Sequence, residues 1–335
     1  MRLVRSAALC AAGLALAACT LLPARAVPHD AVPVVHASRV HLDPDRPDRT
    51  RVGQVRFLGG LQLRSTDPRF GGLSGARVSA DGKRLITVSD RGWWVELDLG
   101  LEQGVPARVE AARITPLVDA GGNPLTGSDG DAEALELFPD GSWVVAFERN
   151  HRLWRYPEGP ASPRALAFDV PADLRKAPWN QGAEAIAALP DRRMVVLTEG
   201  AFDHQRRLKG WVGVPGTRWD PIRVTQTGIL HPTDLGVLPD GDLLLLERRF
   251  TWLGGAGARL SRIPLAALAA GAPIEPEELV ELGFDLTIDN MEALAVVPGS
   301  DPARFYVLSD DNYSAAQRTL LLVFELTTGQ AVAPD

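Results

Sequence analysis

The amino-acid sequence predicts an all-β fold, a single β-propeller built from antiparallel four-stranded blades. One pattern, in which an acid, an apolar strand, a turn, a second apolar strand and another acid follow each other, occurs five times. Its copies start 59, 51, 50 and 58 residues apart, a period typical of propeller blades. Aligned on the first acid, or on the serine that replaces it, the copies are placed by Ser74, Glu133, Glu184, Asp234 and Glu292.

Each of these hairpins is followed by one or two further strand-like runs, which gives about four short strands per unit. The last unit is one strand short, because only nine residues follow Leu326. A β-branched and apolar stretch near Val52 to Leu63 is therefore expected to complete the final blade and close the ring. Five units predict five blades, and a divergent sixth unit within the longer spacings is the alternative.

The N-terminus has the features of an export signal, with basic Arg2 and Arg5 followed by an apolar run from Ala7 to Ala18. The run ends in Leu-Ala-Ala-Cys, which resembles a bacterial lipobox, so residues 1–18 are expected to be removed and Cys19 to be lipidated. Cleavage after Ala26 is the alternative. Either way we expect an exported protein, either periplasmic or an outer-membrane lipoprotein held to the membrane by its lipid only.

Residues 19–50 are rich in Pro, Asp and Arg without a period, which predicts a flexible tether before a propeller domain of residues 51–335. The two cysteines of the sequence, Cys10 and Cys19, both precede this domain. The domain therefore has no disulfide, no thiolate metal site and no cysteine nucleophile.

The net charge of −7 includes three arginines near the N-terminus, so the chain that follows them carries about −10. A negative charge of this size argues against a nucleic-acid partner. Instead, a small-molecule substrate and a monomeric state are expected.

Acids at both ends of each hairpin predict pairs that face each other across two strands. Positions opposite each other in an antiparallel hairpin have numbers with a constant sum, and Glu133 with Glu148 is centred on a Pro-Asp-Gly turn. The same rule pairs Ser74 with Asp90, Glu184 with Glu199, Asp234 with Glu247 and Glu292 with Asp310. All these ends lie away from the turns, so the acids are expected to crowd one mouth of the central channel.

Facing carboxylates need compensation, because two charges about 5 Å apart repel by roughly 3 kcal/mol at an effective dielectric near 20. A hard cation with oxygen ligands such as Ca²⁺ would compensate them. So would the arginines that follow the second acids, or protonation of some of the acids. A purely structural alternative is one polar residue per blade that binds backbone amides of the loops.

These same segments resemble the phytase-like family of exported bacterial proteins, which is described by an esterase-like activity of phytase. The resemblance is carried by FGGLSG with VSDRG, DAEAL with its turn, NQGAEAIA, LPDGDLLLLERRF, and NMEALAVVPG with VLSDDNYS. It implies that the repeated acids, including Asp311, form the functional centre. The chain departs from the family at Asp234, where a Glu is more usual, which puts a ligand role there in doubt.

The resemblance implies hydrolysis of a phosphoester or carboxylester, and the physically coherent mechanism is metal-assisted. We expect Glu133, Glu184 and Glu292 to act in catalysis. The Ca²⁺ ligands are expected to be Asp90, Glu148, Glu199, Glu247 and Asp310. The residues expected to bind substrate oxyanions are Arg91, Arg149 and Arg248.

Two alternatives remain open at this point. One is a non-catalytic propeller, anchored in the cell envelope, that binds a protein or a glycan. The other is a Ca²⁺-dependent hydrolase that resembles lactonases. A serine hydrolase is improbable, because the sequence contains no Gly-x-Ser-x-Gly motif.

Overall fold

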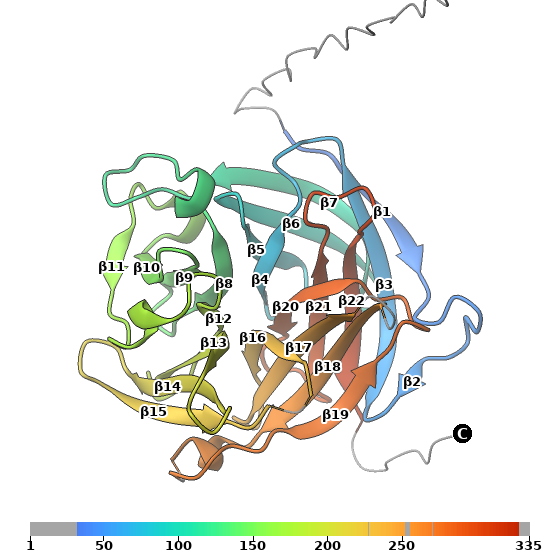
Figure 1. The fold of residues 1–335 in the computed structure, drawn as a ribbon. Coiled ribbons are helices and arrows are strands. Elements are labelled where there is room, and N and C mark those ends of the chain that lie inside the picture. Colours follow the sequence, from blue (N-terminus) through green and yellow to red (C-terminus); the bar gives the residue numbers. More distant parts are fainter. Residues whose placement is uncertain (1–31, 227, 252–254, 270, 328–335) are drawn as a thin grey trace, which may run out of the picture. The chain divides into compact units, whose positions relative to one another are not determined.

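Five antiparallel sheets form the blades of a propeller in the computed structural model (Figure 1), as the sequence predicts. The structure describes residues 32–226, 228–251, 255–269 and 271–327. The innermost strands of the blades contact one another in ring order, from β4 to β8, β12, β16, β20 and back to β4. The repeat therefore closes on itself after five blades, without a sixth.

The strands of the blades are as follows, from the innermost to the outermost. Blade one comprises β4 (Leu73–Val78), β5 (Arg84–Ser89), β6 (Trp93–Glu102) and β7 (Val105–Pro116). Blade two comprises β8 (Ala132–Leu137), β9 (Trp143–Phe147), β10 (Arg152–Tyr156) and β11 (Leu166–Phe168). Blade three comprises β12 (Ala183–Ala188), β13 (Met194–Phe202), β14 (Leu208–Val214) and β15 (Arg218–Val224).

Blade four comprises β16 (His231–Val237), β17 (Leu243–Thr251), β18 (Gly255–Ile263) and β19 (Glu277–Leu282). Blade five comprises β20 (Asn290–Val296), β21 (Arg304–Asp310), β22 (Thr319–Leu326), β3 (Val55–Ser65) and β1 (Val35–Val40), with β2 (Arg51–Val52) beside β3. The described 3₁₀ turns are η1 (Gly127–Asp129), η2 (Gly159–Ala161), η3 (Leu174–Lys176) and η4 (Leu265–Ala269).

Apolar residues on both faces of each sheet hold neighbouring blades together. Between blades one and two, for example, Val88 and Trp94 share a buried cluster with Leu135 and Phe147. Because the inner strands of a blade are covered on both faces, strands such as β5 and β9 are short, nearly continuous apolar runs. The ends of the strands, where the runs stop, are left for polar side chains.

The fifth blade joins both ends of the chain. Strand β3 pairs with β22 along its length, which confirms the prediction that an N-terminal strand closes the ring. Strand β1 then pairs with β3, although residues 35–40 lie inside the segment expected to be a tether. Leu42, which follows β1, is buried in the core. The folded domain therefore begins near residue 32, and the expected tether of residues 19–50 is at most residues 19–31.

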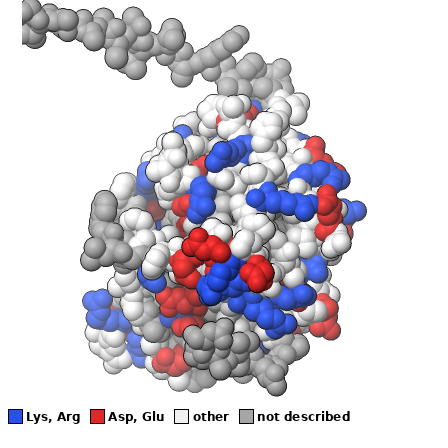
Figure 2. Space-filling view, turned by 90° about the vertical axis from the view of Figure 1, so that its right-hand side faces the viewer, with Lys and Arg blue, Asp and Glu red and all other residues white. Residues whose placement is uncertain are grey.

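Basic and acidic side chains are interleaved on the side of the domain that Figure 2 shows, the right-hand side of Figure 1. Ion pairs on blades one and five are of this kind, such as Arg108 with Glu110 and Arg56 with Glu325. The described part of this face thus carries no large patch of a single sign.

Among the described residues, no helix has the length and apolar character needed to cross a membrane. The predicted signal segment, the lipidation site Cys19 and the alternative cleavage site after Ala26 lie outside the described residues. Export and lipid attachment therefore stay predictions.

Candidate functional site

The innermost strand of every blade contains a one-residue bulge near its start. Such a bulge leaves one residue outside the strand pairing and changes the direction of its side chain. Blades two, three and five place a glutamate there, so three carboxyl groups meet near the propeller axis. The bulge residues are Gly75, Glu133, Glu184, Thr233 and Glu292.

The bulges overturn the predicted facing pairs. Glu148 does not face Glu133; its backbone N–H donates to the carbonyl oxygen of Asp131 at 2.9 Å. Likewise, Glu199 lies opposite Gly182 rather than Glu184, with an N–H to O distance of 3.1 Å. The constant-sum rule assumes regular pairing, and one extra residue in the inner strand shifts its partner by one position.

In blade four, the alignment of the repeats on their acids is shifted by one residue. Asp234 pairs with Leu246, one position beyond the bulge, and Thr233 takes the place that Glu133 has in blade two. Glu247, predicted as a metal ligand, instead accepts two hydrogen bonds from Arg259, at 2.8 and 3.0 Å, within its own blade. The facing pair Asp234–Glu247 is therefore wrong, and Glu247 lies outside the cluster of acids.

In the same blade Arg248 occupies the position that Glu148 has in blade two, opposite His231. The turns could have revealed this. The Pro-Asp-Gly turns of blades two and four are 100 residues apart. An alignment on these turns therefore matches Glu133 with Thr233 and Glu148 with Arg248. Aligning the repeats on their acids concealed that offset.

Blades one and five also depart from the predicted pairs. Ser74 faces Val88, and the N–H of Asp90 instead donates to the carbonyl oxygen of Gly72 at 2.9 Å. In blade five Asp310 faces Asn290, because Glu292 is the bulge residue. Both acids still lie beside those of other blades, since Asp131 of blade two raises the pKa of Asp90, and Asp90 of blade one raises that of Asp310.

We call the resulting cluster the acidic mouth. Four blades contribute to it, and neighbouring carboxylates raise the pKa of Asp90, Glu133, Glu184 and Asp310 through their negative charges. The cluster contains most of the predicted catalytic and metal-binding acids, with Asp131 as an unpredicted member. The acidic mouth consists of Asp90, Asp131, Glu133, Glu148, Glu184, Glu199, Glu292 and Asp310.

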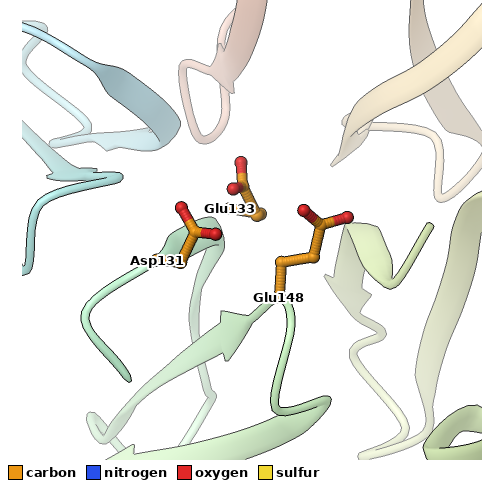
Figure 3. A group of neighbouring side chains, drawn as sticks. All are labelled: Asp131, Glu133 and Glu148. Carbon is orange, nitrogen blue, oxygen red and sulfur yellow. The ribbon is translucent and has the colours of Figure 1, made fainter. Parts of the chain in front are cut away.

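Two groups of three carboxylates in the acidic mouth have the geometry to hold a cation. Oxygens of Asp131, Glu133 and Glu148 lie within 4.8 Å of one another (Figure 3), and so do oxygens of Glu148, Glu184 and Glu199. Nearby, Oδ1 of Asp90 is buried without a hydrogen-bond partner. A set of anionic oxygen ligands fits a hard cation such as Ca²⁺, with Glu148 common to both groups.

Burial and mutual repulsion hold protons on these acids. Loss of hydration is the largest cause that raises the pKa of Glu133 and Glu184 well above the usual range, followed by the neighbouring carboxylates. Burial likewise raises the pKa of Asp90 to about 6, of Glu292 to about 7 and of Asp310 to about 8. Without a cation, part of the acidic mouth is therefore protonated near neutral pH.

This charge state predicts a pH-dependent stability. In EDTA, the free energy of unfolding should fall between pH 5 and pH 8. Acids whose folded pKa lies above the unfolded value of about 4 keep protons only in the folded state, and raising the pH removes them. For Glu292 alone, with a folded pKa of about 7, the loss is on the order of 3 kcal/mol. Urea unfolding at both pH values measures it.

Glu292→Gln is the matched variant, because it keeps the shape and removes one titrating group. Its free energy of unfolding should depend less on pH than that of the wild type. A wild-type stability that is flat or rises from pH 5 to pH 8 would contradict the raised pKa values.

Three predicted arginines lie around the acidic mouth, and they differ in what they contact. Arg248 is the most engaged, since it pairs with Glu292 at 2.8 Å and with Glu199 at 3.3 Å. Arg149 pairs with Asp131 at 2.6 Å and is otherwise exposed. Arg91 is exposed, and its guanidinium lies 3.4 Å from the centre of the Tyr313 ring. Two of the three thus keep donors available at the surface.

Deeper along the axis, one arginine connects all five innermost strands. Arg77 of β4 donates to the carboxylate of Glu136 on β8, at 2.9 and 3.0 Å, and its Nη1 lies 3.4 Å from Asp234 on β16. It also donates to backbone carbonyl oxygens of β4, β12, β16 and β20. Asp234, which the sequence placed at the mouth, therefore belongs to this central network instead.

Sequence reasoning missed Arg77 and Glu136 as well as Asp131. A signal for the first two is their place in strands that are otherwise apolar, LSGARV and AEALEL, where a charge must find a buried partner. Gly75, the bulge residue of blade one, has a φ of 53°, and a Cβ there would lie 2.5 Å from the Leu135 nitrogen. Only glycine fits that bulge between two blades.

Comparison with known proteins adds a family. A family model described as "Phytase-like: Esterase-like activity of phytase" matches residues 68–313. No curated protein sequence matches the chain.

Among solved structures, one similar fold is the PQQ-bound form of an aldose sugar dehydrogenase from Streptomyces coelicolor. It is 16% identical, with a TM-score of 0.42, and the match covers 82% of this chain and 98% of that one. Another is a protein named as a candidate gluconolactonase, 12% identical, with a TM-score of 0.41 and coverage of 88% and 99%. Similarity at this level says nothing of activity.

Proposed function

The chain belongs to the phytase-like family, and from that premise we propose that it is a metal-dependent hydrolase of phosphoester or carboxylester bonds. The observation that carries the proposal is the acidic mouth, where carboxylates of separate blades converge at one end of the axis. Two overlapping groups of three carboxylate oxygens lie within 4.8 Å there. A purely structural role would need one polar residue per blade, not groups of neighbouring acids.

The two groups assign the ligands. Asp131, Glu133 and Glu148, or Glu148, Glu184 and Glu199, would hold Ca²⁺. A bound Ca²⁺ would supply positive charge that polarises the phosphoryl or carbonyl oxygen of an ester. In this proposal Glu133 and Glu184 are ligands as well as candidate catalytic groups.

Glu292 is the carboxylate best suited to move a proton. It lies at a bulge beside the two groups, and its pKa is raised to about 7, first by burial. A group with a pKa near the working pH can accept a proton from an attacking water and return it to the leaving group. Asn290 donates to Oε1 of Glu292 at 2.8 Å, and Nε of Arg248 forms an ion pair with the same oxygen at 2.8 Å, so both hold it in place.

The three arginines around the acidic mouth have different proposed roles. Arg248 donates to Glu199 and Asn290 and forms an ion pair with Glu292, so we assign it to position acids rather than to bind substrate. Arg91 and Arg149 are exposed at the rim and are the better candidates for contacting an oxyanion of the substrate. We further propose, from the N-terminal pattern alone, that the domain is exported and held by a lipid at Cys19.

The test has a binding arm and an activity arm. Thermal unfolding in EDTA and then in excess Ca²⁺ should show stabilisation, about 2.7 kcal/mol at 100 times the dissociation constant. Glu184→Gln should reduce that shift, while Glu110→Gln, an exposed acid on β7, should leave it unchanged. No shift with wild-type protein would remove the metal from the proposal.

In the activity arm, p-nitrophenyl phosphate, bis(p-nitrophenyl) phosphate and p-nitrophenyl acetate are offered to the Ca²⁺-loaded protein. The double variant Glu133→Gln with Glu184→Gln should lower the rate at least tenfold, and Glu110→Gln should not. Equal rates would make the acids structural. A Ca²⁺ shift without hydrolysis of any ester would favour the non-catalytic binding propeller.

A further inference from the structure

A second site lies next to the acidic mouth, where the turn between β9 and β10 meets the segment between η3 and β12. It is a cavity of about 420 Å³ with three arginines and a histidine in its wall, and we call it the basic pocket. Among the residues that line the basic pocket are Arg149, His151, Arg152, Arg175 and Trp179.

Two of its arginines have no carboxylate partner among the described residues. Arg152 donates only to backbone carbonyl oxygens, those of Asn150 and Asp129, and its Nε is buried without a hydrogen-bond partner. Arg175 is exposed and forms no ion pair within the described part of the chain. Carbonyl oxygens satisfy donors without cancelling their charge, so the pocket wall carries positive charge for a ligand to neutralise.

His151 adds a buried polar atom that is not satisfied. Its ring is nine-tenths buried, and Nε2 lies 3.0 Å from the carbonyl oxygen of Pro178, so Nε2 carries a proton. Nδ1 has no partner. It lies over Gly182, where an added Cβ would be 2.5 Å away.

The basic pocket shares a wall with the acidic mouth. Arg149 contacts both, because its Nε lies 2.6 Å from Oδ2 of Asp131. On the other side of His151, the N–H of Gly182 donates to Oε1 of Glu148 at 3.3 Å. An anion bound in the pocket would therefore lie beside both groups of metal-binding carboxylates.

The entrance offers an apolar surface as well. Trp179 is 66% exposed, and its ring centre lies 5.2 Å from the guanidinium carbon of Arg149. An exposed indole beside an arginine can cover the organic part of a ligand. The volume exceeds that of a phosphate group alone, so there is room for part of an organic substituent.

We propose that the basic pocket binds the phosphate group of a phosphate monoester substrate. Planar guanidinium groups match phosphate oxygens in pairs of parallel hydrogen bonds, and the two that lack a carboxylate partner favour a doubly charged oxyanion over a neutral carboxylester. The identity of the substrate rests on the proposed function, whereas binding of phosphate by the pocket does not.

Binding of inorganic phosphate tests the pocket without any activity. Isothermal titration calorimetry is done on the full chain with EDTA present, so that a cation in the acidic mouth cannot be what binds the anion. Wild-type protein should bind phosphate, and Arg175→Gln should raise the dissociation constant at least tenfold. Arg152→Lys, which keeps the charge but loses the planar fork, should also weaken binding.

Arg218→Gln is the matched control, because Arg218 is an exposed arginine that pairs with Asp220 on the same strand, β15 of blade three. It should bind phosphate like the wild type. Sulfate should compete with phosphate if the pocket reads a doubly charged tetrahedral oxyanion, and acetate should not. Absence of phosphate binding, or equal weakening by Arg175→Gln and Arg218→Gln, would overturn the pocket.

Kinetics separate this inference from the proposed function. Arg175→Gln should raise KM for p-nitrophenyl phosphate at unchanged kcat and leave p-nitrophenyl acetate hydrolysis unaffected. Hydrolysis without phosphate binding would remove the pocket and keep the hydrolase. Phosphate binding that Arg175→Gln weakens, in a protein that hydrolyses none of the esters, would keep the pocket and remove the hydrolase.

Discussion

Replacing Arg77 by methionine is expected to lower the free energy of unfolding by about 3–5 kcal/mol, the range seen when one partner of a buried ion pair is removed. Asp234 is fully buried and Glu136 nearly so, and Arg77 is the cation that both contact. The substitution also leaves backbone carbonyl oxygens of four blades without that donor. Arg77 contacts every blade, so the loss should be global.

Urea unfolding of Arg77→Met against Arg84→Met measures this. Arg84 is half exposed, and its partner Glu96 keeps a second arginine, Arg113, so the loss should be below about 1 kcal/mol. The triple variant Arg77→Met, Glu136→Gln and Asp234→Asn should recover part of the stability, because no charge is left buried alone. Similar losses for the Arg77 and Arg84 variants would show that the central network contributes little.

Removing the N-terminal strand is expected to abolish folding. A domain that starts at residue 67 lacks β3, which buries Val55, Phe57, Leu61 and Leu63 against its neighbours. At roughly 1.5–3 kcal/mol each, these four side chains account for about 6–12 kcal/mol, comparable to the whole stability of a typical domain. The exposed edge of β22 would in addition promote aggregation.

Two longer forms serve as controls for this truncation. A domain that starts at residue 32 should unfold cooperatively, and one that starts at residue 41, without β1, should remain folded with a lower Tm. Circular dichroism and gel filtration of the three forms decide the matter. A soluble domain starting at residue 67 with a cooperative transition would show that three strands suffice in blade five.

The sequence predicted the architecture because the repeat is regular where packing is regular. Apolar strands around turns at about 50-residue spacing are a property of every blade, and they are visible without structure. The closing strand was predictable for the same reason, since the last unit lacked a partner for β22. Strand β1 was not, because its sequence VHASRV alternates little and one face of it is exposed.

The sequence predicted most of the residues of the acidic mouth, but not how their strands pair. Acids recur in the sequence, and most of those expected at the mouth lie there. The bulges that place Glu133, Glu184 and Glu292 leave no mark of their own in an alignment built on those acids. Blade four shows the consequence. Alignment of the repeats by their acids matched Asp234 with Glu133, whereas the strand pairing places Thr233 there and Arg248 at the position of Glu148. Likewise, the basic pocket joins the turn after the second hairpin to residues just before the third, and the repeat gives no sign of that contact.

The closure of blade five also determines when the newly made chain can complete its fold. Leu61 of β3 faces Leu321 of β22, 260 positions later, so the pair can form only when almost the whole chain has been synthesised. At roughly 5–20 residues per second this takes about 13–52 s, during which the apolar strand β3 waits without its partner. Such long-range pairing is slow. Chaperones that hold unfolded chains would therefore be expected to determine how much of this protein reaches its folded state.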